Sequence, residues 1–202
     1  MDECAVAALQ VLDAAGVQTP ILLLGTSWGG IVAPRIALKA PDRVKGMVLF
    51  NTTAEPPNLS AWTTSTMLTW MLAVSAIDGF VNKMLLSLQL SAGTRRDKPQ
   101  VGANIAARFR SWNRRAVIKT VRSVLVDRDG VLDALSNVKA PALIVSGAED
   151  AILPTAMSLR IVAKLPNARH VEVPGAAHLV PLEEPEAANA LIGEFIEKLP
   201  TR

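Results

Sequence analysis

Four short apolar runs recur along the chain and predict the strands of one sheet. They are Ile21 to Leu24, Met47 to Phe50, Ala142 to Ser146 and His170 to Val173. Each run is preceded or followed by sequence with helical periodicity, which is typical of parallel strands joined by crossover helices. Three of the runs are apolar on both faces, as strands covered by helices on each side must be. We therefore predict an α/β fold with a mostly parallel sheet flanked by helices.

A long helical segment separates the second predicted strand from the third. Residues 54–137 carry no strand signal, and a structureless loop of that length is uncommon in a compact domain. Helical spacing recurs there at Ile105, Phe109, Trp112 and Ala116. We predict a helical cap, or lid, at 54–137, inserted into a core formed by residues 1–53 and 138–202.

The stretch GTSWGG lies between the first predicted strand and a predicted helix. A strand that turns into a helix within a few residues can present one side chain at the carboxyl edge of the sheet, provided that its neighbours are small. Gly25 and Gly29 meet that need. Ser27 lies at the turn, and the backbone N–H of Trp28 starts the helix, where it can point at an oxygen that becomes negative. The pattern predicts a nucleophilic serine with Trp28 as an oxyanion-hole donor.

A serine hydroxyl is a weak nucleophile that needs a base, and the base needs an orienting carboxylate. Asp150 follows the third predicted strand and His178 follows the fourth. Parallel strands bring their carboxyl ends to one edge, so Ser27, Asp150 and His178 are predicted to converge as a catalytic triad. Glu149 competes with Asp150 for the role of the acid. His170 is predicted to precede its strand, at the opposite end of the sheet, and to be structural.

These residues resemble the α/β-hydrolase fold family. GTSWGG is similar to its nucleophile elbow, SGAEDAILP to its acid loop and PGAAHLVPLEEP to its histidine loop. The helical insert lies where that family carries its cap, and the resemblance runs from about Val11 to Leu199. It implies Ser27 as the nucleophile and His178 as the general base and acid. The family's G-x-x-D spacing selects Asp150 as the partner of the histidine.

The resemblance also implies that the sheet is truncated. The family begins with further strands, and the loop after the third of them supplies a second oxyanion donor. No such segment precedes the run Ile21 to Leu24 in this sequence. That strand is therefore predicted to be an exposed apolar edge, which invites pairing. We predict a homo-oligomer in which two chains join antiparallel through Ile21 to Leu24, and weak turnover because one oxyanion donor is lacking.

Composition and charge limit the kinds of molecule that the chain is expected to bind. Half of the 202 residues are hydrophobic, and the formal net charge is only +3. This charge is too small to gather a polynucleotide, so no nucleic-acid partner is predicted. The insert holds eleven Lys and Arg against six Asp and Glu, which we interpret as a solvated helix face.

Several sequence features bear on location and on cofactors. No uninterrupted apolar span of about 18 or more residues occurs, and the N-terminus lacks the basic start and apolar core of a secretion signal. Cys4 is the only cysteine, which rules out an internal disulfide. A cytoplasmic protein without a membrane partner is predicted. No cofactor is predicted and no metal, because the two histidines are poorly placed and no acidic or cysteine cluster has ligand spacing.

The leading functional hypothesis is a serine hydrolase that cleaves carboxylic esters of small to medium acyl chains through an acyl-enzyme on Ser27. An apolar acyl pocket is predicted from residues of the insert, namely Trp62, Met67, Trp70 and Met71. One alternative is a non-catalytic, truncated binding protein of the same fold. Another is a proline-type aminopeptidase, because the sequence S-W-G also occurs at the nucleophile elbow of such enzymes. That activity would need an acidic site for the amine of the substrate, whereas this lid is basic.

Overall fold

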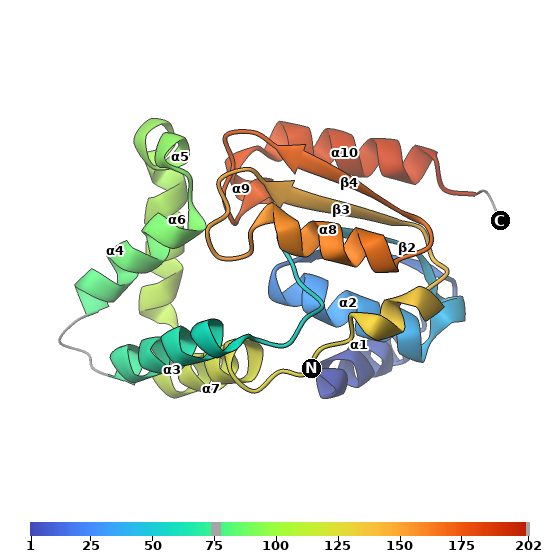
Figure 1. Cartoon of the computed structure of the whole chain (residues 1–202), viewed down its shortest axis with the longest axis horizontal. Helices are drawn as coiled ribbons and strands as arrows, with labels where there is room; N and C mark the ends of the chain where they lie inside the picture. Colours follow the sequence, from blue (N-terminus) through green and yellow to red (C-terminus); the bar gives the residue numbers. More distant parts are fainter. Residues whose placement is uncertain (74–77, 201–202) are drawn as a thin grey trace.

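A four-stranded sheet lies between two layers of helices (Figure 1). The computed structural model describes residues 1–73 and 78–200. Residues 74–77, inside the predicted cap, and 201–202, at the end of the predicted core, lie outside the described residues. The strands are β1 (Ile21–Thr26), β2 (Val44–Phe50), β3 (Ala142–Gly147) and β4 (Ala168–Val173). Each contains one of the predicted runs, so the predicted α/β fold class is confirmed.

The sheet is entirely parallel, with strand order β1-β2-β3-β4. Parallel pairing brings the carboxyl ends of all four strands to one edge of the sheet. Among the described residues β1 pairs only with β2, so β1 lies at a side of the sheet as predicted.

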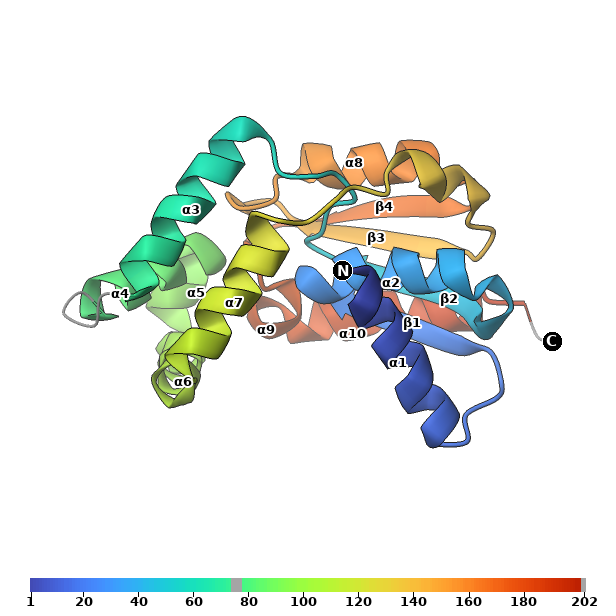
Figure 2. The same cartoon turned by 90° about the horizontal axis from the view of Figure 1, so that it is seen from below.

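Helices cover both faces of the sheet. Those outside the predicted insert are α1 (Asp2–Ala14), α2 (Trp28–Lys39), η1 (Pro41–Arg43), α8 (Thr155–Lys164), α9 (Val180–Glu183) and α10 (Pro185–Glu197), whereas η3 (Asp133–Asn137) forms the end of that insert. Helices α1, α2 and α8 lie on one face, and α10 lies along the other (Figure 2). The central strands β2 and β3 are thus buried between two helical layers, whereas β1 and β4 are only partly covered.

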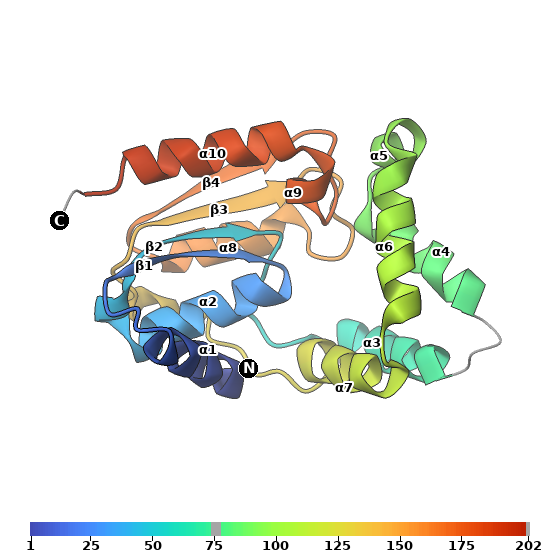
Figure 3. The ribbon, with the colours of Figure 1, turned by 180° about the vertical axis from the view of Figure 1, so that it is seen from behind.

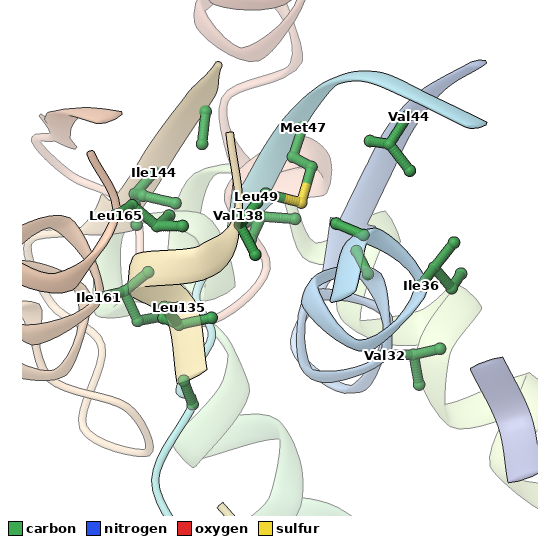
Figure 4. Packing of buried hydrophobic residues seen from close by; sticks show 14 of the residues in the cluster. Val32, Ile36, Val44, Met47, Leu49, Leu135, Val138, Ile144, Ile161 and Leu165 are labelled. Atoms are coloured by element: carbon green, nitrogen blue, oxygen red, sulfur yellow. The ribbon is translucent and has the colours of Figure 1, made fainter. Parts of the chain in front are cut away.

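The core consists of two apolar clusters, one on each face of the sheet. Met47, Leu49 and Ile144 point toward α1, α2 and α8, where they join Val32 and Ile161 (Figure 4). The alternate residues of the same strands point the other way, toward α10. They are Val48, Phe50, Leu143 and Val145. Burial on both sides explains why the strand sequences are continuously apolar rather than alternating.

A group of helices connects β2 to β3 and lies beyond the carboxyl ends of the strands (Figures 1 and 3). Its described helices are α3 (Leu59–Ala73), α4 (Asp78–Gln89), α5 (Ala92–Asp97), α6 (Pro99–Ser111) and α7 (Arg114–Leu125). Helix α3 packs against α7, and α4 and α5 pack against α6. No helix within the described ranges is both long and apolar enough to cross a membrane.

Candidate active site

Ser27 lies on a sharp turn between β1 and α2. Its backbone has φ 51° and ψ −111°, a positive φ that non-glycine residues rarely adopt. Two hydrogen bonds hold the turn against β2 and the segment after it. The N–H of Ser27 donates to Phe50 O at 2.9 Å, and Thr52 Oγ1 donates to Ser27 O at 2.9 Å. Trp28 opens α2, so its N–H lies in the first turn, where helical N–H groups have no intrahelical acceptor.

Small residues let β1 and α2 approach each other at this turn. A Cβ on Gly25 would lie 2.5 Å from the carbonyl carbon of Gly29, and one on Gly30 would lie 2.6 Å from Thr52 Cβ. Gly25 is therefore needed as predicted. A Cβ on Gly29 would meet no atom within 4 Å, so the steric need that we assigned to Gly29 was wrong. Gly30 instead allows α2 to approach Thr52, in the segment after β2.

His178 connects Ser27 to Asp150. His178 Nε2 lies 2.9 Å from Ser27 Oγ, and Nδ1 lies 2.9 Å from Asp150 Oδ2. A carboxylate only accepts hydrogen bonds, so Nδ1 carries the ring proton. In the neutral ring, Nε2 then accepts a hydrogen bond from the serine hydroxyl. The structure thus brings together the three residues that the sequence predicted to converge. Glu149 is exposed and Asp150 is buried.

Asp150 is buried in a set of hydrogen-bond donors. Its Oδ1 accepts from the N–H groups of Ile152 at 2.8 Å and Leu153 at 3.0 Å, and its Oδ2 also accepts from Asn51 Nδ2 at 2.8 Å. Burial raises the pKa of Asp150, but the hydrogen bond from His178 and the positive charge of its ring when protonated, with the bonds from Leu153 and Asn51, outweigh that effect. The pKa of Asp150 therefore lies below its usual value, which favours the ionised form.

Asn51 is a site residue that sequence reasoning missed. It is fully buried with φ 48°, and its Nδ2 donates both to Asp150 Oδ2 and to Ala177 O at 3.0 Å. One amide group thus connects the acid loop to the histidine loop. A signal was present, because Asn51 directly follows the buried run of β2, at the edge of the sheet where Asp150 and His178 were found.

A cavity of ≈ 1120 Å³ opens above Ser27 and His178. Most of its apolar lining comes from the insert and includes Leu68, Leu85, Leu88, Phe109, Trp112, Val117, Val121 and Leu125, and the segment after β3 adds Ala151, Ile152 and Met157. Its polar lining includes Asn58, Ser60, Thr64, Ser65, Asn82 and Gln89. No group of three or more His, Cys, Asp or Glu side chains in residues 1–73 and 78–200 is placed to hold a metal ion.

The four residues predicted to bind substrate lie away from this cavity. Trp62 and Trp70 line a separate pocket of ≈ 280 Å³ on another face of α3. Met67 is exposed, Met71 is partly buried, and neither lines the cavity beside Ser27. Other residues of α3, among them Leu68, line the cavity. Helical spacing alone could not show which face of α3 turns toward Ser27.

A second Ser–His pair lies inside the sheet. Ser146 Oγ of β3 is 2.9 Å from His170 Nε2 of β4 and 3.1 Å from Thr155 Oγ1 of α8. His170 lies within β4 rather than before it, and burial lowers its pKa despite the opposing charge of Glu172. Ser146 is fully buried and does not line the cavity. This pair ties the strands to α8, and its serine is not exposed to a substrate.

Comparison with known proteins agrees with this geometry. Residues 1–185 match the family model described as the alpha/beta hydrolase fold. A pimeloyl-[acyl-carrier protein] methyl ester esterase of Aromatoleum aromaticum is 27% identical over 190 residues, which covers 87% of this chain and 73% of the relative. A putative non-heme bromoperoxidase of Mycobacterium tuberculosis is 27% identical over 195 residues, covering 94% of this chain and 71% of that protein.

Solved structures show the same similarity. A thermophilic esterase from Thermogutta terrifontis superposes with a TM-score of 0.89 at 26% sequence identity, and the match covers 99% of this chain and 73% of that one. The family match spans most of the chain, and the strand order and the turn at Ser27 fit it. The chain therefore belongs to the alpha/beta hydrolase fold family.

Proposed function

We propose that the chain is a serine hydrolase that cleaves carboxylic esters of small to medium acyl chains through an acyl-enzyme on Ser27. One observation carries this proposal: two hydrogen bonds of 2.9 Å join Ser27 to His178 and His178 to Asp150. The serine of this chain of hydrogen bonds also lines a cavity of ≈ 1120 Å³. A nucleophile, a base and an orienting group in hydrogen-bond contact are the arrangement that activates a serine.

The first half of the reaction forms the acyl-enzyme. Ser27 Oγ attacks the carbonyl carbon of the ester while His178 Nε2 takes the hydroxyl proton. The carbonyl oxygen becomes negative, and the N–H of Trp28, at the start of α2, is the donor that stabilises it. When the tetrahedral intermediate collapses, the bond to the alcohol oxygen breaks and His178 gives its proton to that oxygen. The ionised Asp150 stabilises the imidazolium between these two steps.

The second half releases the acid. A water molecule takes the place of the alcohol and gives a proton to His178 Nε2 as its oxygen attacks the acyl carbon. The ester bond to Ser27 breaks, and the proton returns from His178 to Ser27 Oγ. Each group ends in its starting state, so the cycle needs no cofactor.

The inserted helices supply a suitable place for an acyl chain. We propose that α3 to α7 act as a cap, because they lie beyond the strand ends and four of them, α3, α4, α6 and α7, line the cavity above Ser27. Apolar side chains from α4, from α7 and from the residue that follows α6, namely Leu85, Val121 and Trp112, offer an acyl chain an apolar environment. The names of two similar proteins, both esterases, point in the same direction.

The proposal is tested with a fluorophosphonate probe and p-nitrophenyl esters of graded acyl length. Ser27→Ala should abolish both labelling and ester hydrolysis. Ser146→Ala is the matched control, because Ser146 also lies 2.9 Å from a histidine but is buried in the sheet. It should keep both activities if it folds. Full ester turnover in Ser27→Ala would reject the mechanism.

These assays, together with a peptidase substrate, distinguish the two alternative functions. A folded wild-type chain that is neither labelled nor active on any ester would favour the non-catalytic binding protein. Cleavage of proline p-nitroanilide, without cleavage of the esters, would favour the proline-type aminopeptidase.

A further inference from the structure

We propose that Glu183 is a positioning residue that fixes the backbone around His178 and connects it to the start of α5. This inference rests on the proposed function of His178 as the base. Glu183 ends the short helix α9, five residues after His178, and it is fully buried. Its side chain does not line the cavity, so it acts through its neighbours and not on a substrate.

The carboxylate of Glu183 accepts hydrogen bonds from both residues that flank His178. Oε1 accepts from Ala177 N at 2.9 Å and from Leu179 N at 3.2 Å. The N–H of His178 itself donates to Gln89 O, at the end of α4, at 3.1 Å. Three consecutive N–H groups of the histidine loop are therefore bonded, two of them to one side-chain oxygen. This arrangement restrains the backbone from which the imidazole reaches Ser27.

The other carboxylate oxygen of Glu183 forms a hydrogen bond with the insert. Oε2 accepts from Ser91 N at 2.7 Å, and Ser91 is the N-cap residue of α5. Lys98, which follows α5, strengthens this connection, because its Nζ donates to Glu183 O and to Glu184 Oε1 at 3.0 Å. One buried carboxylate thus connects the insert to the histidine loop.

Loss of this acceptor should affect the position of His178 more than substrate binding. Glu183→Gln keeps the length of the side chain but replaces one acceptor oxygen with an NH₂ group, which cannot accept from a backbone N–H. The histidine loop or Ser91 then loses its partner. A displacement of about 1 Å of a catalytic group can cost about a hundredfold in rate. The expected loss is therefore kinetic and specific to steps that use His178.

The experiment compares Glu183→Gln with Glu186→Gln, an exposed glutamate in the first turn of α10. Both variants are measured for the rate constant of fluorophosphonate labelling, for kcat and KM on a p-nitrophenyl ester, and for amide hydrogen exchange. In Glu183→Gln, labelling and kcat should fall together by about tenfold to a hundredfold, with KM within about twofold of the wild type. The amides of Ser91, Ala177 and Leu179 should exchange faster. Glu186→Gln should match the wild type throughout.

Each of the other possible outcomes contradicts one part of the proposal. Unchanged labelling and kcat in a folded Glu183→Gln would overturn the positioning role, even if exchange became faster. If that variant does not fold, Glu183→Asp is used with the same readouts, because its shorter side chain cannot reach both partners. An unlabelled wild type would reject the proposed function instead. The inference would then depend on the NMR resonances of the His178 ring, and an unchanged spectrum in Glu183→Gln would overturn it.

Discussion

Asp150 shows how single contacts determine the chemistry of the site. Four donors surround its carboxylate: the N–H groups of Ile152 and Leu153, the amide of Asn51 and the ring of His178. Each favours the ionised form, and together they outweigh the effect of burial on the pKa. The same contacts fix the direction of the carboxylate, and hence the tilt of the imidazole ring.

We expect acid to remove the stabilisation that Asp150 contributes. Its pKa in the folded chain is lower than the unfolded value of about 3.9. The contribution is therefore fully present above the unfolded pKa and is lost as pH falls through the folded pKa. Urea unfolding between pH 6 and pH 3 should show that the advantage of the wild type over Asp150→Asn shrinks below about pH 4. An advantage that stays constant over this range would contradict the expectation.

Sequence reasoning found the three residues that meet at the candidate site but not those that hold them. Ser27, Asp150 and His178 each follow a recognisable strand, so parallel topology alone predicts that they meet. Glu183 offers no comparable signal, because its importance comes from Ser91, which lies 92 positions away in the sequence. Contacts between loops of this kind depend on the finished fold.

At the level of elements, the turn at Ser27 depends on close approach of β1 and α2. Gly25→Ala would place a Cβ 2.5 Å from the backbone of Gly29. We expect it to lower the free energy of unfolding by about 1–3 kcal/mol, as other overpacking changes do. Gly29→Ala is the matched control, since its Cβ meets nothing within 4 Å. Chemical denaturation of the two variants should separate them, and equal losses of stability would contradict this account of the turn.

Helix α7 has two faces that serve different pockets, and this allows a test of the acyl site. Val121 lines the cavity beside Ser27, whereas Ile118 lines the separate pocket with Trp62 and Trp70. Val121→Phe should lower kcat/KM for long-chain p-nitrophenyl esters by about tenfold or more, because a filled pocket excludes the chain. The acetate ester should be little affected. Ile118→Phe should leave the chain-length profile unchanged; a shared effect would place the acyl chain elsewhere.

The strands could be predicted closely, whereas the insert could be predicted only in outline. Burial on both faces makes a strand continuously apolar, and this pattern is visible in β2 and β3. In α3, large apolar residues such as Leu59, Met67 and Trp70 are exposed, so hydrophobic spacing does not indicate the inward face. The direction in which Trp62 and Trp70 point was therefore not available from the sequence.

At the level of the whole molecule, the edge of the sheet formed by β1 bears on how copies of this chain associate. Leu24 of β1 is 52% exposed, and β1 has no second partner strand among the described residues. We propose that two copies of this chain pair antiparallel through β1 to form one continuous sheet. Unpaired apolar edges favour such association, and a lysine on the edge opposes it.

Leu24→Lys should therefore convert a dimer into a monomer. The control is Leu159→Lys on α8, a leucine of similar exposure at 49% that lies away from the edge. Sedimentation velocity at micromolar concentration should show a dimer for the wild type and for the control. A wild-type chain that sediments as a monomer would reject the proposed pairing.

The bond between Ser27 and His178 joins positions 151 residues apart, and this has a consequence for synthesis on the ribosome. The turn that presents the serine emerges from the ribosome before the imidazole, which follows β4. A nascent chain that ends between these two positions carries the serine hydroxyl without its histidine partner. If Ser27 is the nucleophile that we propose, fragments that end before position 178 should therefore be inert toward esters.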